Sequence, residues 1–252
     1  AEFPKPYISL IDGIVMGGGL GISVNGSHRV IGDNIMAAMP ETGIGLLPDV
    51  GATAFLNACP GRLGLYLGLT GTRLDTADTL YAGFGTHYVP TKNHTNLLNA
   101  LVSKVFSGDR FATIDTIIDD FTSDTVGSGL QEKQADIDRL FAADDMETII
   151  GTLQNDGSKL AMDSLSAFDR MSPTSLKVTA RQITENPGVS IRDSLVLEYR
   201  LVSQTLLRHD FYEGIRAALI DKDHDPQWKP ATLADVTSDY IDEHFASLGD
   251  QE

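Results

Sequence analysis

Three consecutive glycines, Gly17, Gly18 and Gly19, constrain this chain more than any other feature of its sequence. Glycine loses more conformational freedom on folding than other residues, so a triplet indicates a place where backbone N–H groups come close to something negative. The apolar run 6–11 predicts a buried strand, and after a turn the glycines are expected to begin a helix that runs through Ser23. The triplet therefore predicts backbone donors presented at the start of a helix.

Two acidic residues follow a second predicted strand. The apolar segment 35–39 leads to Glu41, and Asp49 comes after a short loop marked by glycine and proline. An acid directly after a buried strand has no packing role, although either residue could instead cap a following helix. Fixed N–H donors together with two acids predict a site for chemistry on a carbonyl group.

Several longer motifs carry a resemblance to a known family. They are MGGGLG, MPETGIGLLPDVG and LTGTRL in the first third of the chain, then SPTSLK (172–177), EYR (198–200) and HDFYEGIRAALIDKDHDPQWKP (209–230). Over nearly the whole chain, least clearly at 106–171, the sequence resembles the 3-hydroxyisobutyryl-CoA hydrolase branch of the crotonase (enoyl-CoA hydratase/isomerase) superfamily. The resemblance implies an α/β fold, a crotonase-like spiral of β-β-α units with a helical C-terminal region.

The resemblance also implies a role for each candidate site residue. The N–H of Gly18 would point at the thioester oxygen, with Gly17 beside it in the substrate site. Glu41 would be the catalytic acid/base or nucleophile, and Asp49 the second polar group, binding a substrate hydroxyl or orienting water. Hydratases of the superfamily place their first glutamate where this chain has Gly21. Hydration by two acids is therefore disfavoured.

The expected reaction is acyl-CoA thioester hydrolysis, with 3-hydroxyisobutyryl-CoA, an intermediate of valine breakdown, as the preferred substrate. One alternative is a hydratase or isomerase acting on another acyl-CoA. Another is a structural subunit of the same fold without catalysis. No metal or separate cofactor is expected, since CoA is part of the substrate.

Composition excludes some functions and bounds the compartment. Among 252 residues, 19 are basic and 35 acidic, and the formal net charge of −16 disfavours a nucleic-acid partner. The single cysteine, Cys59, excludes an internal disulfide and fits the bacterial cytoplasm or the mitochondrial matrix. No apolar run approaches the roughly 18–20 residues that span a bilayer, so a soluble protein without a membrane partner is expected.

The pattern of elements changes near Pro90. Residues 1–90 are expected to form the C-terminal part of an α/β crotonase core, and residues 91–252 a helical region. The long amphipathic helix predicted at 191–207 would pack internally or serve an interface, which leaves a homo-oligomer open. The family's upstream strands, and the loop that donates the other half of its oxyanion hole, have no counterpart here. A separate or missing N-terminal segment is therefore expected to complete the oxyanion hole.

Charged residues near the C-terminal end allow two interpretations. Arg216, Lys222 and Lys229 could meet CoA phosphates, or they could be solvated or paired with Asp221 and Asp223. The acids of this segment do not form an EF-hand loop, because a proline stands at the required glycine position.

Overall fold

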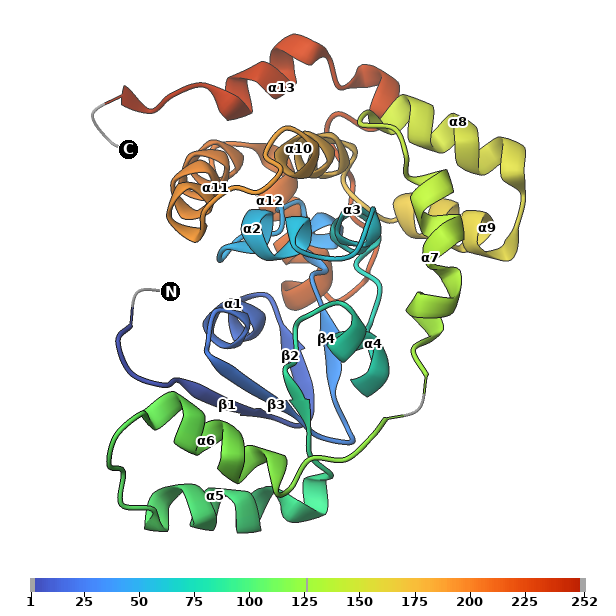
Figure 1. Ribbon diagram of the computed structural model, residues 1–252. Helices are drawn as coiled ribbons and strands as arrows, with labels where there is room; N and C mark the ends of the chain where they lie inside the picture. Colours follow the sequence, from blue (N-terminus) through green and yellow to red (C-terminus); the bar gives the residue numbers. More distant parts are fainter. Residues whose placement is uncertain (1–2, 126, 250–252) are drawn as a thin grey trace. The chain divides into compact units, whose positions relative to one another are not determined.

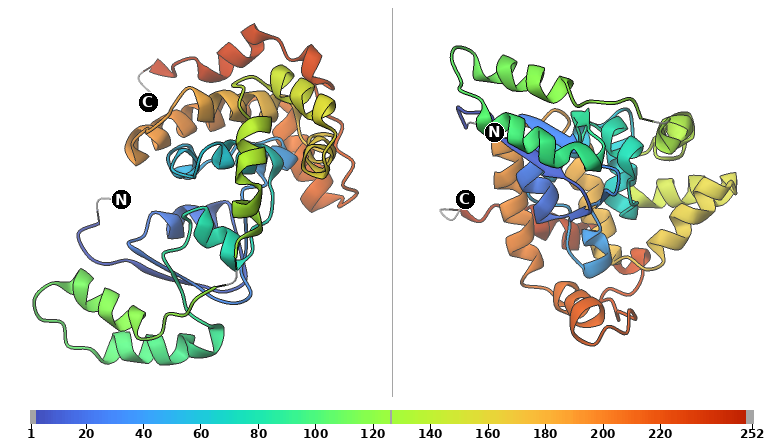
Figure 2. Two further views of the ribbon diagram at one scale, coloured as in Figure 1. Left: turned by 45° about the vertical axis from the view of Figure 1, so that its right-hand side comes forward. Right: turned by 90° about the horizontal axis from the view of Figure 1, so that it is seen from below.

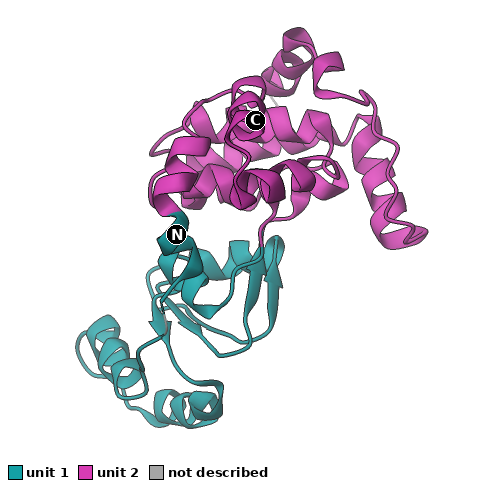
Figure 3. Cartoon of the chain, turned by 90° about the vertical axis from the view of Figure 1, so that its right-hand side faces the viewer, with its two compact units in different colours: residues 1–38, 73–133 teal, residues 39–72, 134–252 magenta. Residues whose placement is uncertain are grey.

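The computed structural model describes residues 3–125 and 127–249 and divides the chain into two compact units (Figure 3). Unit 1 takes in Ala1–Ala38 and Arg73–Lys133, and unit 2 takes in Met39–Thr72 and Gln134–Glu252. The predicted domain boundary near Pro90 is not one of the points where the chain passes between the units, and it stays a prediction. All described secondary-structure elements after the strand at His87–Tyr88 are helices.

Unit 1 contains two small parallel sheets. The first pairs β1 (Ile8–Ile11) with β3 (His28–Ile31) and β3 with β5 (His87–Tyr88), with Ile8 opposite His28 in the register. The second pairs β2 (Ile14–Met16) with β4 (Met36–Ala38). The strands at 8–11 and 36–38 were expected, whereas the sequence analysis did not identify β2 or β3 as strands.

The helices of unit 1 lie around these sheets (Figure 1). They are α1 (Gly18–Val24), α4 (Thr76–Tyr81), η2 (Thr91–Asn93), α5 (His94–Ser103), α6 (Arg110–Asp119) and the beginning of α7 (Gly129–Leu140). Helices α5 and α6 lie side by side, the green pair in Figure 2. Their apolar faces share a core with β3, formed by Val30, Val89, Leu97, Leu101, Ile114 and Ile118. Burial of this cluster joins the helical hairpin to the sheet.

Unit 2 is helical throughout its described part. Its elements are η1 (Glu41–Ile44), α2 (Ala52–Asn57), α3 (Leu63–Thr70), the end of α7, α8 (Met146–Asp156), α9 (Lys159–Phe168), α10 (Pro173–Thr184), α11 (Ile191–Thr205), α12 (His209–Ile215), the π-helix η3 (Arg216–Ile220), η4 (Leu233–Asp235) and α13 (Ser238–Phe245).

Local sequence explains where several of these helices begin. Ser158, Ser172 and Ser190 precede α9, α10 and α11, and each side chain accepts a hydrogen bond from a backbone N–H in the first turn. Pro173 occupies the first turn of α10, where its missing N–H costs nothing. Every residue of α3 is buried, as expected for a helix that is apolar all round.

A second core holds the outer helices of unit 2 together. It consists of Leu47, Val178, Leu201, Val236 and Ile241. These side chains come from the segment after η1 and from α10, α11 and α13, so the long helix predicted at 191–207 has an internal packing face. None of the described helices is long and apolar enough to cross a bilayer.

Candidate active site

The glycine triplet lies at the start of α1 in unit 1, as predicted. Gly17 is the N-cap with φ 48° and ψ −118°, a conformation that side-chain-bearing residues rarely adopt, and Gly18 is the first helical residue. A Cβ at Gly19 would stand 3.2 Å from a Val15 methyl, whereas one at Gly18 would meet nothing within 4 Å. Close packing therefore explains Gly19 but not Gly18. The N–H groups of this first turn have no partner within the helix.

Glu41 lies in unit 2 and begins η1, shortly after β4 ends. The next residue fixes this turn from both sides: the Thr42 hydroxyl donates to the Leu69 carbonyl at 3.3 Å, and the Thr42 carbonyl accepts from Ser172 N–H at 3.0 Å. At the end of η1, Gly45 packs so tightly against the Asp210 carbonyl that a Cβ would lie 2.2 Å from the oxygen. The backbone carrying Glu41 is thus held by α3, α10 and α12.

The Glu41 side chain is 5% exposed, and its Oε2 atom has no hydrogen-bond partner in the described chain. Burial raises the pKa of Glu41 to about 8; its own backbone N–H opposes the rise, and the charge of Asp49 adds to it. A carboxyl with a pKa near neutrality can give or take a proton at physiological pH. The Oε2 atom of Glu41 is buried without a hydrogen-bond donor among the described residues, which leaves its bonding capacity unused.

Asp49 lies in the loop between η1 and α2 and is half-buried. Burial raises the pKa of its carboxyl too. The N-cap residue of α2 is Gly51, so Asp49 does not occupy the cap position of that helix.

The structure thus brings two of the predicted site residues, Glu41 and Asp49, into one unit, close enough for the charge of one to act on the other. Gly17 and Gly18 belong to the other unit. Their role beside the acids stays a prediction.

A group of buried polar residues around the Asp49 loop was missed by the sequence analysis. Glu198 of α11 accepts hydrogen bonds from the backbone N–H groups of Gly51 and Thr53, and Gln182 of α10 donates to the Pro48 carbonyl at 2.7 Å. Glu198 was noticed only as part of the EYR motif. Gln182 lies 134 residues after Pro48, and Glu198 lies 147 residues after Gly51. No local sequence pattern could have linked them to the loop.

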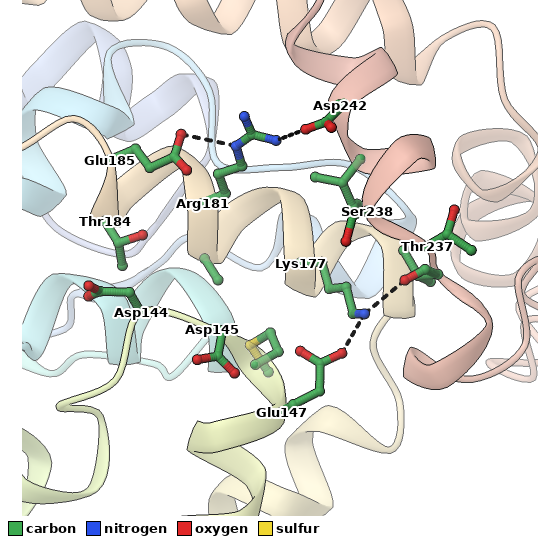
Figure 4. Close-up of a pocket in the computed structure, with 14 residues that line it drawn as sticks. Asp144, Asp145, Glu147, Lys177, Arg181, Thr184, Glu185, Thr237, Ser238 and Asp242 are labelled. Carbon is green, nitrogen blue, oxygen red and sulfur yellow. Dashed lines mark hydrogen bonds and ion pairs between the residues drawn. The ribbon is translucent and has the colours of Figure 1, made fainter.

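A polar cavity of about 570 Å³ lies elsewhere in unit 2, among α8, α10 and α13 (Figure 4). Its two cations already have acidic partners: Lys177 pairs with Glu147 at 2.5 Å, and Arg181 with Glu185 at 3.0 Å and with Asp242. Neither Glu41 nor Asp49 lines this cavity.

The C-terminal charges have a structural explanation in part. Arg216 pairs with Glu213, Asp221 and Asp223 at 2.6–2.8 Å, which confirms the ion-pair alternative for this arginine. The bond from Arg216, together with one from Gln227 N–H, lowers the pKa of Glu213 to about 2. Within the described residues no group of three or more His, Cys, Asp or Glu side chains is arranged to hold a metal ion.

A helix begun by glycines on a parallel sheet, with a buried and a half-buried acid in a helical unit, defines an α/β protein with a candidate acid–base site. The chain belongs to the enoyl-CoA hydratase/isomerase family, which it matches over residues 1–245. The predicted crotonase membership is therefore confirmed.

Two named relatives are similar to this chain over nearly its whole length. The chain is 44% identical to the mitochondrial 3-hydroxyisobutyryl-CoA hydrolase of Xenopus tropicalis, over 99% of this chain and 66% of the relative. It is 43% identical to that of Homo sapiens, over 98% of this chain and 65% of the relative. The chain thus spans slightly less than two thirds of the length of these relatives.

Two solved structures share the fold closely. A carnitinyl-CoA dehydratase from Mycobacterium thermoresistibile has a TM-score of 0.90 at 36% identity, covering 98% of this chain and 70% of that one. An enoyl-CoA hydratase from Rhodobacter sphaeroides 2.4.1 has a TM-score of 0.89 at 37% identity, covering 99% and 71%. The expected crotonase-like α/β fold is confirmed.

Proposed function

We propose that this chain is part of an acyl-CoA thioester hydrolase that converts 3-hydroxyisobutyryl-CoA into 3-hydroxyisobutyrate and CoA. One observation carries the proposal: Glu41 is 5% exposed, has an unpartnered oxygen, and has a pKa raised to about 8. Relatives at 43–44% identity bear the name of this hydrolase, which supports the choice of substrate.

In the proposed reaction, the Gly18 N–H and a second donor stabilise negative charge on the thioester oxygen. Glu41, once ionised, removes a proton from water, and the water oxygen attacks the carbonyl carbon. Alternatively, Glu41 attacks directly and forms a mixed anhydride that water then hydrolyses. In either case the C–S bond breaks and the CoA sulfur leaves as a thiolate that takes up a proton. Asp49 binds the substrate hydroxyl or orients the water.

The raised pKa of Glu41 suits both halves of this cycle. With a pKa of about 8, Glu41 is mostly protonated at pH 7, and a minor fraction is ionised. That fraction supplies the base or nucleophile, and the protonated form can return its proton to the leaving sulfur. A carboxyl with an ordinary pKa would be a poor proton donor at this pH.

A second candidate is hydration or isomerisation of another acyl-CoA. The two structurally similar proteins, named as a dehydratase and a hydratase, favour it. The glycine at position 21 argues against hydration, because two-acid hydration would need a carboxylate there. The non-catalytic structural subunit is the third outcome that an assay must separate.

The proposal also includes a place and a partner for the chain. Its relatives are named as mitochondrial, so the mitochondrial matrix is the proposed compartment, and valine breakdown the pathway. The second oxyanion donor is proposed to come from a part of the family protein that this chain does not span.

The test is a thiol-release assay on 3-hydroxyisobutyryl-CoA with the protein that carries this chain, after intact-mass analysis of what co-purifies. Glu41→Gln should lower CoA release by about 10²–10⁴-fold. The matched control is Glu147→Gln, whose side chain is 57% exposed in the α8–α10–α13 cavity and should release CoA at the wild-type rate. Consumption of a crotonyl-type double bond without free thiol would favour the hydratase. Silence towards both substrates, with all segments present, would leave the structural subunit.

A further inference from the structure

Glu198 is a fully enclosed carboxylate that the proposed reaction does not use. It is 2% exposed and accepts four hydrogen bonds: from Gly51 N–H at 2.6 Å, Thr53 N–H at 2.8 Å, the Thr53 hydroxyl at 2.7 Å and the Ser194 hydroxyl at 2.8 Å. Burial raises the pKa of Glu198, and the bonds from Thr53 and Gly51 oppose that rise. An acceptor with four donors and no acidic neighbour among its contacts is suited to the ionised form.

These contacts cap a helix from a distant part of the sequence. Helix α2 receives no cap from its own N-cap residue, and Glu198 lies 147 residues beyond Gly51. The negative carboxylate lies against the first N–H groups of α2, where the helix dipole favours it. Ser194 extends the cap, because its oxygen also accepts from Ala54 N–H at 3.3 Å.

The other side of the same loop is held as well. Gln182 is completely buried, and its Nε2 donates to the Pro48 carbonyl at 2.7 Å and to the Thr53 hydroxyl at 2.8 Å. The network therefore grips the backbone at the residue before Asp49 and again two residues after it.

Between these anchors the backbone is in an unfavourable conformation. Val50 has φ 59° and Gly51 has φ 92°, and a β-branched residue at positive φ is an outlier. Such a conformation persists only where the surroundings enforce it, and it clusters at functional sites. The anchors at Pro48 and Gly51 bracket Asp49, and the strained residue Val50 follows it directly. The charge of Asp49 acts on Glu41.

We propose that Glu198 is a positioning residue: through Gly51 N–H, and together with Gln182, it fixes the loop that aims the Asp49 carboxylate. This inference rests on the proposed function in so far as it assigns the loop a catalytic task. The anchoring itself is independent of which acyl-CoA is the substrate.

The sharpest variant is Glu198→Gln. Among the described residues, Oε2 accepts from Gly51 N–H alone, whereas Oε1 accepts the three other bonds. A glutamine can keep its carbonyl at the Oε1 position, and its NH₂ group then faces the Gly51 N–H, donor against donor. The change therefore removes one anchor and keeps the rest of the cap.

The expected result has two independent parts. The Gly51 amide should exchange with solvent about ten-fold faster or more. The turnover number for CoA release should fall about ten-fold or more, with KM nearly unchanged and the pH midpoint of the rate moved. Gln182→Leu, which removes the Pro48 anchor, should act in the same direction.

The matched control is Asp138→Asn. Asp138 also reaches a helix start from a distant segment, since it accepts from Arg62 N–H at 2.7 Å just before α3. Its bonds from Arg62 N–H and from the Gln134 side chain both go to Oδ1, where an asparagine can keep its carbonyl. This variant should therefore leave Gly51 exchange and turnover unchanged.

Glu198→Gln with Gly51 exchange, turnover and pH midpoint at wild-type values would overturn the proposal, whatever the loss of thermal stability. If the wild-type protein releases no CoA, the hydrolase function fails, and Gly51 exchange alone decides the inference. Faster exchange in Glu198→Gln than in Asp138→Asn would then uphold the anchoring, and equal exchange would overturn it.

Discussion

Two buried glutamates of unit 2 lie in opposite surroundings. Glu41 is 5% exposed and has an oxygen without a partner, whereas Glu198 is 2% exposed and accepts four hydrogen bonds. Both have a raised pKa because both are buried. Four hydrogen-bond donors replace the water that Glu198 loses on burial, whereas the Oε2 atom of Glu41 has no donor in the described chain. A compensated carboxylate stabilises the fold in one charge state, while an uncompensated one is ready to change its charge.

The largest expected effect of this difference is a pH-dependent loss of stability caused by Glu41. Its pKa is about 8 in the folded protein against 4.5 as an ordinary glutamate, so between these values the native state holds a proton that the unfolded state has released. The free energy of unfolding therefore falls as pH rises from about 4.5 to 8 and levels off above that. By linkage the total contribution is about 5 kcal/mol.

Urea unfolding of the wild type and Glu41→Gln at several pH values isolates this contribution, because every other group titrates in both proteins. The stability difference between them should change steadily from pH 5 to 8 in favour of the variant. A difference that is independent of pH would mean that Glu41 has an ordinary pKa, and the contrast with Glu198 would disappear.

The next effect is a difference in the sign of the stability change between two Glu→Leu substitutions. Glu198→Leu leaves two backbone N–H groups and two hydroxyls without their acceptor and should destabilise the protein by about 3 kcal/mol or more. Glu41→Leu removes a buried carboxyl whose donor is its own backbone N–H and whose Oε2 atom has no partner in the described chain, so it should be neutral or stabilising at pH 8. Denaturant midpoints of both variants at that pH measure the effect. Equal losses would contradict the distinction.

The sequence alone predicted Glu41 as a candidate site residue but gave no indication of the contacts that Glu198 makes. Glu41 could be predicted as a candidate site residue because an acid shortly after an apolar strand has no local explanation and lies within a long family motif. Glu198 lies within an amphipathic helix where an acid is unremarkable. Its donors come from Gly51 and Thr53, 145–147 residues earlier, a pairing that only the tertiary fold creates.

The same reason accounts for what was missed in the fold. The long amphipathic helix predicted at 191–207 corresponds to α11 (Ile191–Thr205) within two residues. Strands β2 and β3 are three and four residues long, and each lies between glycines or next to polar residues. Their strand character comes from pairing with β4 and β1, not from their own pattern.

A smaller effect is expected at the hydroxyl that joins the two anchors of the Asp49 loop. Thr53 is fully buried; its Oγ1 donates to Glu198 and accepts from Gln182. Thr53→Val keeps the shape and the backbone N–H but removes both bonds, so it should cost about 1–3 kcal/mol. Thermal unfolding measures the loss. Thr148→Val, at the exposed first turn of α8, is the control and should change stability little.

The smallest effect concerns the coupling between the two acids. Asp49→Asn removes the negative charge that helps to raise the pKa of Glu41, so the pKa of Glu41 should move towards lower values. The movement should be only a part of the total shift, because burial is its larger cause. A carbon-13 NMR titration of the Glu41 carboxyl in the two proteins measures it. If the midpoint stays where it is in the wild type, the acids do not sense each other. If it returns to an ordinary glutamate value, Asp49 rather than burial sets the chemistry of Glu41, and the comparison with Glu198 would have to be made on charge instead of hydrogen bonding.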